Sequence, residues 1–349
     1  MNVLFVIGNG FDLQLGLPTS YCDFYQYYCK CPSNSKVINK LKDNINTLGD
    51  RNWSDLELAL GKYTANTQDS SEFITVYDDI QKELQNYLLT VDSLVEQNVL
   101  ELNATPESFF DGFRNPEKYF MSEISDTINS YIVEQNFNFG PGVLNVKVLS
   151  FNYTHTFEHF YNMPIPEELN GGDRYLGKKF HVHRELMNNA SIWLGVDNLD
   201  QIENESFRQN EDIILRLVKQ DIIREIGTSI IEDTDRMIST ADLICLFGVS
   251  LGDTDATWVK KIGKSISFGV PTLYFVKEQK SFVSDNDRLV SQRRFKNGLV
   301  RKLENLGLSI DKDKMRLFVE VNSPIFIDGT ENRHDENLKK VLEKLSVVD

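Results

Sequence analysis

Residues whose types suit chemistry gather in four short clusters of this 349-residue chain. A glycine turn occupies residues 8–12, an Asn-Tyr-Thr triplet residues 152–154, and a second glycine-bearing turn residues 248–255. The remaining cluster is the alternating pair His181 and His183. Glycine turns let the backbone approach an anion without hindrance from Cβ atoms, an amide can hold a water or a hydroxyl, and an imidazole exchanges protons near neutral pH. Together these residues predict a nucleotide pocket with an acid–base group.

The first glycine turn departs from the dinucleotide-binding fingerprint. Gly8, Asn9 and Gly10 follow an apolar run at residues 3–7, but Leu13 stands where G-x-G-x-x-G requires its third glycine. The turn is therefore not that of an ordinary dehydrogenase. A plain strand-to-helix turn remains an alternative to a phosphate-binding loop.

The histidines admit three interpretations. On a strand, His181 and His183 would face the same side, where they could act in acid–base chemistry, bind a metal or form structural hydrogen bonds. No further ligands occur at zinc spacing and the cysteines form no pair of C-x-x-C motifs, so we expect no metal and reduced thiols. His155 and His159 lie at an expected helix start, where simple exposure is the favoured interpretation.

Charge and hydropathy exclude several classes of partner. The net charge of −15 repels phosphate backbones, so we expect no general binding of nucleic acid. No apolar run reaches the roughly 18 residues that span a membrane, and the first strand lacks the basic flank of a signal peptide. We therefore expect a cytoplasmic protein. The content of 41% hydrophobic residues predicts a globular chain.

The elements that must position these clusters alternate between strands and helices. Apolar runs predict strands at residues 3–7, 146–151, 179–182, 192–196, 243–247, 272–276 and 317–321. Ser54 and Glu57 suggest a capping box, and helical spacing extends over residues 73–94, 211–238 and 254–267. Alternating strands and helices predict an α/β fold with a mostly parallel sheet covered by helices. We expect one domain at residues 1–349, with a helical insertion or lid at residues 53–135.

In their order along the chain, these motifs resemble those of the AbiH family. The matching segments are G-N-G-F-D at residues 8–12, S-F-N-Y-T-H-T-F-E at 150–158, H-V-H at 181–183 and G-V-S-L-G-D-T-D at 248–255. The resemblance extends over nearly the whole chain, to about residue 321. This family of bacterial abortive-infection proteins, directed against phage, looks like a divergent branch of the Sir2-like superfamily. The resemblance implies a Sir2-like Rossmann-type core that binds NAD.

The resemblance also implies a role for each matching residue. Asn152 matches the catalytic asparagine near the nicotinamide ribose, and His183 matches by position the general base or ribose-orienting group. The implied cofactor-binding residues are Gly8, Asn9, Gly10, Phe11, Asp12, Gly248, Ser250, Leu251 and Asp253.

Two departures from the Sir2-like pattern bear on the reaction. Arg184 stands where a glycine is expected after the catalytic histidine, so its side chain could crowd the site or contact a phosphate. The zinc-binding cysteines of protein-deacylating sirtuins are absent, which disfavours deacylation and favours NAD hydrolysis.

The resemblance therefore implies an antiphage NAD glycohydrolase that depletes the cofactor of an infected cell. Asn152 would hold a water or the ribose hydroxyls, and His183 would accept a proton. Two alternatives remain open: a non-catalytic nucleotide-binding sensor, and an ADP-ribosyltransferase that modifies a protein. The sequence also leaves open whether a phage-derived activator is needed and whether the chain forms a homo-oligomer.

Overall fold

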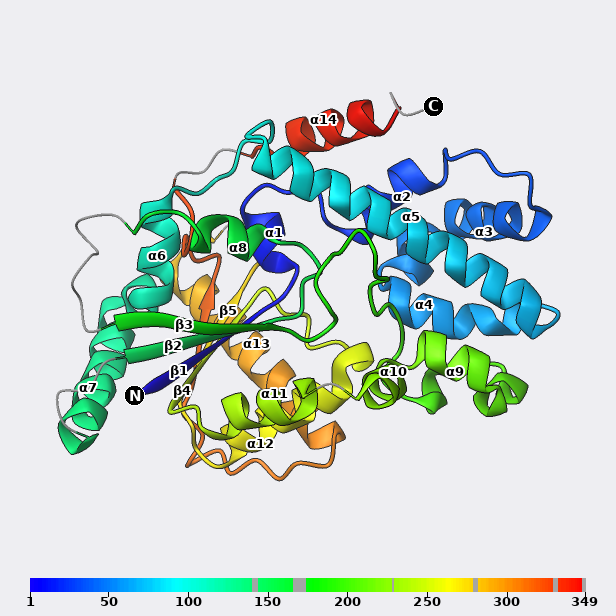
Figure 1. Cartoon of the computed structure of the whole chain (residues 1–349). Coiled ribbons are helices and arrows are strands. Elements are labelled where there is room, and N and C mark those ends of the chain that lie inside the picture. Colours follow the sequence, from blue (N-terminus) through cyan, green and yellow to red (C-terminus); the bar gives the residue numbers. More distant parts are fainter. Residues whose placement is uncertain (140–143, 166–173, 228, 279–281, 329–331, 347–349) are drawn as a thin grey trace.

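A computed structural model describes the chain at residues 1–139, 144–165, 174–227, 229–278, 282–328 and 332–346. Among these residues, six strands form one sheet in the order β3-β2-β1-β4-β5-β6, and every neighbouring pair is parallel (Figure 1). The strands are β1 (Asn2–Ile7), β2 (Leu144–Ser150), β3 (Arg174–His181), β4 (Leu243–Phe247), β5 (Thr272–Val276) and β6 (Leu317–Val321). This sheet confirms the expected α/β, Rossmann-type class.

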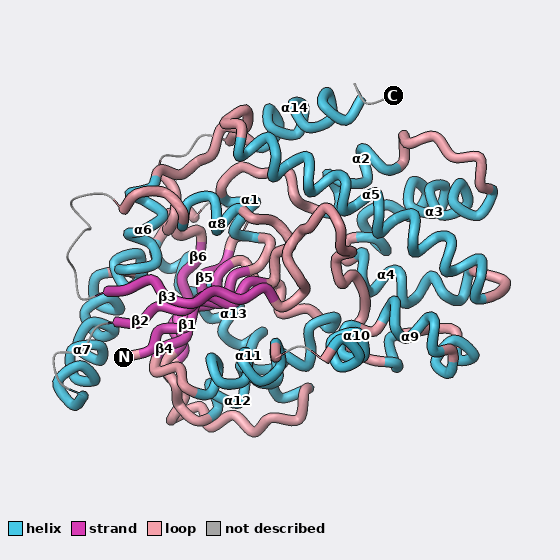
Figure 2. Tube along the Cα trace, viewed as in Figure 1, coloured by secondary structure: helices cyan, strands magenta, loops and turns pink. Residues whose placement is uncertain are grey.

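Helices lie on both faces of the sheet and also extend beyond it (Figure 2). The shorter ones, of 13 residues or fewer, are α1 (Gly10–Gln14), α2 (Tyr21–Tyr28), α4 (Leu56–Tyr63), α6 (Pro106–Arg114), α8 (Thr156–Tyr161), α9 (Glu211–Leu217), α10 (Lys219–Ile226), α11 (Ile230–Ser239), α12 (Ala256–Ser267) and α14 (His334–Ser346). The longer ones are α3 (Lys36–Trp53), α5 (Ser70–Glu96), α7 (Ser122–Phe139) and α13 (Asp285–Asn305). Within the described residues, no helix is long and apolar enough to cross a membrane.

The alternation of side chains along β1 explains the two layers of helices. Phe5 and Ile7 join a core with α1, α6, α7 and α8, whereas Leu4 and Val6 join a core with α10, α11, α12 and α13. Residues 3–7 are each 4% exposed or less, as a strand covered on both faces requires. The continuous apolar run of β1 therefore reflects its central position in a parallel sheet.

A third core lies beside the sheet, in a helical lobe formed by α2, α3, α4, α5 and α9 (Figure 1). Aromatic side chains on α2 and α5 fill much of this core; Phe24, Tyr28, Phe73, Tyr77 and Tyr87 are each 1% exposed or less. The segment expected as one insertion, residues 53–135, divides between two places: α4 and α5 belong to the lobe, whereas α6 and α7 cover the sheet.

Two predicted elements are wrong. Residues 192–196 form no strand: their only ladder contact is a single bridge between Val196 and Val218, although Ile192 and Leu194 are buried. The helix predicted at residues 211–238 is three helices. Its first break, at Val218, allows Lys219 N to donate to the Val196 carbonyl, and its second is a left-handed Gly227 with φ 66°.

The predicted capping box at Ser54 and Glu57 is also wrong. Ser54 ends α3, and Asp55 caps α4 by accepting a hydrogen bond from Leu58 N at 3.0 Å. Aspartate caps helices as well as serine does, so either Ser54 or Asp55 could cap this helix. The chain places Asp55 at the cap position. This correction frees the Glu57 side chain for another role.

The loops that follow β1 and β4 are in backbone contact at the point where the strand order reverses. Gly10 N donates to the Gly248 carbonyl at 2.9 Å, and a Cβ atom on Gly10 would lie 2.5 Å from Gly248 Cα. Gly248 itself has φ 62°, a conformation that favours glycine. These glycines therefore let two loops touch at the topological switch point, where open α/β sheets hold ligands.

Gly248→Ala should destabilise the chain by roughly 2–4 kcal/mol, because the new Cβ would lie 2.6 Å from Gly10 C in a left-handed backbone. Gly298→Ala is the matched control: it lies within α13, where an added Cβ atom would meet nothing within 4 Å, and should stabilise by about 0.5–1 kcal/mol. Urea denaturation measures both. Equal stability of the two variants would contradict the proposed loop contact.

Candidate functional site

A cavity of about 360 Å³ opens at the carboxyl ends of β1, β2 and β4, between the sheet and the helical lobe. Its volume lies within the usual range of small-molecule sites. Residues of all four sequence clusters line it: Gly8, Asn9, Asp12, Asn152, Tyr153, Thr154, His183, Gly248, Ser250, Leu251 and Asp255. Segments far apart in the sequence therefore converge where the fold predicts a ligand.

The side chain of Asn152 has a fixed orientation. Its Nδ2 donates to Asp12 Oδ1 at 3.1 Å, which directs the amide oxygen away from that carboxyl group. The Oδ1 of Asn152 is buried and has no hydrogen-bond partner among the described residues. An orphaned acceptor in a ligand-sized cavity is suited to receive a hydrogen bond from a hydroxyl or a water.

Asp12 holds Asn152 from a fully buried position. Its Oδ2 accepts a short hydrogen bond of 2.5 Å from Thr154 Oγ1. Burial raises the pKa of Asp12 to about 7, although the hydrogen bonds from Thr154 and Asn152 partly oppose this shift. The carboxyl group therefore exchanges its proton near neutral pH while it joins the β1 loop to the β2 loop.

His183 lies beside a buried chain of charges. Its Nε2 is 2.9 Å from Asp255 Oδ1, although the two atoms are not aligned for a hydrogen bond. Lys219 Nζ lies 2.8 Å from both Asp255 Oδ1 and Glu57 Oε2, and the Lys219 side chain is 1% exposed. Burial opposes ionisation of Asp255, but Lys219 and His183 outweigh it and hold the pKa of this carboxyl well below its usual range. The imidazole therefore faces a carboxylate that stays ionised.

Lys219 keeps its charge for the same reason. Burial alone would lower its pKa, but Asp255 and Glu57 raise it above its ordinary value. Glu57 extends the network to Tyr153, whose hydroxyl lies 3.0 Å from Glu57 Oε1 and 3.0 Å from the Trp193 carbonyl oxygen. Burial raises the pKa of Tyr153 well above its ordinary value, so this hydroxyl stays protonated as a donor.

Several residues predicted from sequence lie outside the cavity lining. Phe11 is fully buried among the phenylalanines of α6, and Gly10 contacts the Gly248 loop. Asp253 is exposed and pairs with Lys302 at 3.4 Å. His181 also lies outside this lining, and its Nδ1 is 2.8 Å from the Asn152 carbonyl oxygen.

Arg184 neither lines the cavity nor crowds it. Its backbone has φ 64°, the left-handed conformation for which glycine is the ordinary choice. Its guanidinium lies over the Trp193 ring, 5.8 Å from the centroid, and donates to the Ser191 carbonyl at 3.3 Å. The backbone turn that follows His183 is thus retained with an arginine in place of glycine.

Sequence reasoning missed Glu57 and Lys219 as parts of the site. The sequence marks Glu57 only as one half of a capping box with Ser54. Lys219 belongs to a long helical pattern in which nothing marks one lysine as buried. Burial of a lysine depends on distant carboxylates, here Glu57 and Asp255, which no local spacing reveals.

Comparison with known protein families gives one match. Residues 4–276 match the family described as "Bacteriophage abortive infection AbiH". No curated protein matches the chain. The matched range contains every residue that lines the cavity.

Lys219→Met should destabilise the chain by about 3–5 kcal/mol, because Glu57 and Asp255 would stay buried without their cation. Lys302→Met is the matched control, since Lys302 pairs with an Asp253 side chain that is 72% exposed, and it should cost at most about 1 kcal/mol. Chemical denaturation of both variants provides the measurement. A Lys219 variant as stable as the control would show that the buried network adds nothing.

The pKa of Asp12 predicts a pH dependence of stability. The folded chain keeps this proton up to about pH 7, whereas the unfolded chain loses it near pH 3.8. Between pH 3.8 and pH 7 the folded chain binds more protons than the unfolded chain does. The contribution of Asp12 to the free energy of unfolding therefore falls as pH rises and levels off above pH 7. Relative to that of Asp12→Asn, the free energy of unfolding of the wild type should fall by roughly 4 kcal/mol between pH 4 and pH 8. A constant difference between the two denaturation profiles would refute the raised pKa.

Proposed function

The chain belongs to the AbiH family of bacteriophage abortive infection proteins, and from this premise we propose that it hydrolyses the nicotinamide–ribose bond of NAD. Loss of this shared cofactor would arrest the infected cell before phage multiply. The reaction takes place in the cytoplasm on free NAD, and no metal is required for the chemical step. The Sir2-like motifs of the sequence support this choice of substrate.

One observation carries the proposal: the unpartnered Oδ1 of Asn152 in the cavity at the switch point. Asp12 fixes the amide through Nδ2, so this oxygen is already oriented before a ligand enters. Such preorganisation lowers the entropic cost of holding a ribose hydroxyl or an attacking water. Asn152 is 6% exposed and lies two residues beyond the end of β2.

The proposed reaction requires little acid catalysis. Nicotinamide in NAD is already a cation, so the electron pair of the breaking C1′–N bond neutralises its ring as it departs. The ribose then carries oxocarbenium character, and nearby carboxylates such as Asp255 stabilise positive charge. Water adds to C1′ while His183 accepts its proton, which gives ADP-ribose and nicotinamide.

The remainder of the dinucleotide would lie along the glycine loops. Gly8 and Asn9 line the cavity beside Gly248, Ser250 and Leu251, which are the positions that the Sir2-like pattern assigns to phosphates and the adenosine ribose. Among the described residues, no lysine or arginine lines the cavity. We therefore assign phosphate contact to backbone amides and the Ser250 hydroxyl.

Asn152→Ala should reduce NAD cleavage at least about 100-fold, because the attacking water and the ribose lose the amide oxygen that orients them. Release of nicotinamide and ADP-ribose from NAD reports the activity, and thermal melting reports the fold. Asn162→Ala, which changes an exposed asparagine at the end of α8, is the matched control and should retain full activity. Turnover by the Asn152 variant equal to that of wild type would rule out the assigned role.

His183→Ala should lower turnover by about 10²–10⁴ without abolishing NAD binding, since removal of a general base affects the chemical step. Steady-state kinetics and calorimetric titration with NAD separate the two effects.

The NAD pool of phage-infected cells provides a measurement that includes any phage-derived trigger. An unchanged pool in cells that carry the wild-type chain would favour the alternative of a non-catalytic sensor, and ADP-ribose attached to protein would favour transferase activity.

A further inference from the structure

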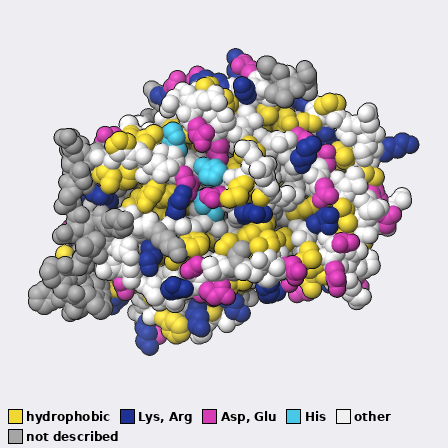
Figure 3. All heavy atoms as spheres, in the orientation of Figure 1, with side chains coloured by type: hydrophobic (Ala, Val, Ile, Leu, Met, Phe, Trp, Pro, Cys, Tyr) yellow, Lys and Arg dark blue, Asp and Glu magenta, His cyan; other side chains and the backbone are white. Residues whose placement is uncertain are grey.

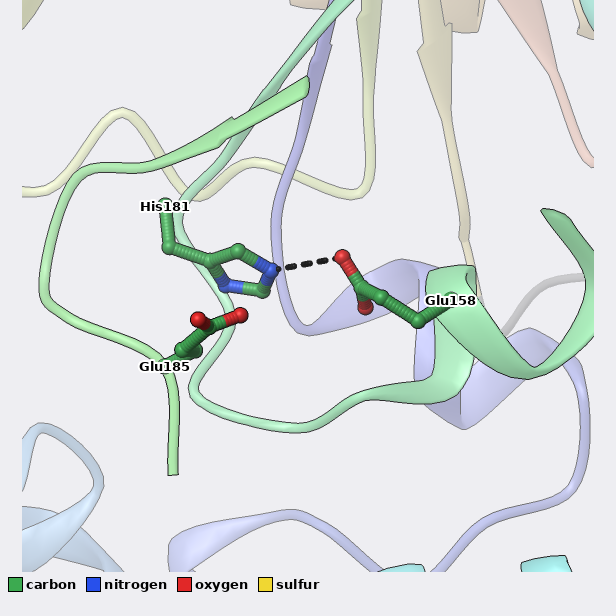
Figure 4. A group of neighbouring side chains, drawn as sticks. All are labelled: Glu158, His181 and Glu185. Atoms are coloured by element: carbon green, nitrogen blue, oxygen red, sulfur yellow. Dashed lines mark hydrogen bonds and ion pairs between the residues drawn. The ribbon is translucent and has the colours of Figure 1, made fainter. Parts of the chain in front are cut away.

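A second group of ionisable side chains lies outside the cavity. Glu158 of α8, His181 at the end of β3 and Glu185 in the following loop each place one ligand atom within 4.8 Å of the others (Figure 4). In the space-filling view, histidine and acidic side chains lie side by side on this face of the molecule (Figure 3). The proposed NAD chemistry uses none of these three residues.

The His181 ring lies between two hydrogen-bond acceptors. Its Nδ1 is 2.8 Å from the backbone oxygen of Asn152, and its Nε2 is 3.0 Å from Glu158 Oε1. A carbonyl and a carboxylate can only accept, so Nδ1 donates its proton and Nε2 must present either a second proton or a bound cation. A backbone carbonyl on Nδ1 is the usual partner that orients a metal-binding imidazole.

His155 repeats this arrangement on the other side of the group. Its Nδ1 is 2.8 Å from Asp92 Oδ2, and its Nε2 is 3.7 Å from Glu185 Oε2. The centroids of the His155 and His181 rings are 6.4 Å apart. Two imidazoles are therefore held through Nδ1, and the Nε2 atom of each faces a glutamate.

Glu158 has an oxygen with no partner. Its Oε1 contacts His181 and, at 2.5 Å, Lys179 Nζ. Its buried Oε2 has no hydrogen bond to any residue that the structure describes, and Glu158 is only 7% exposed. A buried carboxylate oxygen without a partner is costly unless a cation or a donor satisfies it.

We propose that Glu158, His181 and Glu185, with His155 as the fourth ligand, bind a divalent transition-metal ion such as Zn²⁺. Two imidazole nitrogens and two carboxylate oxygens suit such an ion better than Mg²⁺ or Ca²⁺, which prefer oxygen alone. Tetrahedral ligands about 2.1 Å from zinc lie about 3.4 Å from one another. The ligand atoms of Glu158, His181 and Glu185 lie within 4.8 Å of one another, and His155 Nε2 lies 3.7 Å from Glu185 Oε2.

The charges around the group fit the same ion. The carboxylates of Asp92, Glu158 and Glu185 contact the two imidazoles, and Lys179 pairs with Glu158. Carboxylate and imidazole groups gathered in this way are the side chains that bind a divalent cation. The proposal revises the expectation of no metal, which rested on sequence spacing alone.

The ion would connect parts of the chain that frame the NAD cavity. His155 and Glu158 flank the start of α8, His181 ends β3, and Asp92 of α5 holds His155 from the helical lobe. Through its Nδ1, His181 also fixes the backbone of Asn152. The metal site therefore has a positioning role next to the cavity, and its existence does not depend on NAD hydrolysis.

Calorimetric titration of the chelator-treated full chain with Zn²⁺ tests the proposal. We expect one equivalent with micromolar or tighter affinity, which falls at least about tenfold in His181→Ala and in Glu158→Gln. Glu158→Gln keeps the size of the side chain, so it distinguishes loss of a ligand from loss of the fold. His159→Ala, on the same helix next to Glu158, is the matched control and should bind as wild type does.

A second measurement uses thermal melting. Zn²⁺ should raise the melting temperature of the wild type and of His159→Ala, but not that of the two ligand variants, because only a folded site gains stability from the ion. Cys22, Cys29 and Cys31 remain in every variant, so zinc held by thiols would persist in all of them. Binding that is unchanged in both ligand variants, or absent up to about 1 mM Zn²⁺, overturns the proposal.

Discussion

A buried ammonium group holds the cavity together. Lys219 lies between Glu57 of the helical lobe and Asp255 of the loop after β4, and its side chain is 1% exposed. Removal of Lys219 would leave both carboxylates without their cation, whereas removal of either carboxylate would leave Lys219 paired with the other. The ion pairs thus fix the lobe against the sheet, and they hold Asp255 as an anion beside His183.

The opposite wall of the cavity depends on close backbone contact and one carboxyl group. Gly10 and Gly248 bring the loops of β1 and β4 together, and this contact places Asp12 where it reaches the β2 loop. Asp12 then orients Asn152 so that its amide oxygen is free in the cavity. The two walls present a fixed amide and an imidazole paired with a carboxylate, which is the arrangement that water addition to an electrophilic ribose needs.

Local patterns predicted the strands of the central sheet and the clusters at their ends. A continuous apolar run bounded by a glycine turn is typical of a strand that is covered on both faces. The same pattern wrongly predicted a strand at residues 192–196. This segment is buried, but it pairs with another segment through a single bridge between Val196 and Val218. Strand identity depends on a distant partner, as does the burial of Lys219. The positions of Asn152 and His183 in the cavity lining could be predicted, since each follows a strand, whereas the contacts of Glu57 with Lys219 exist only in the folded chain.

The central claim is that NAD occupies the cavity with its nicotinamide ribose beside Asn152. A crystal structure of the Asn152→Ala chain grown with saturating NAD tests it most directly, because the variant should bind the substrate without cleaving it. The account predicts intact NAD with the ribose C1′ between residue 152 and His183, and with the phosphates against Gly8, Asn9 and Ser250. An ordered dinucleotide elsewhere on the chain, or a cavity without NAD under these conditions, would contradict the account.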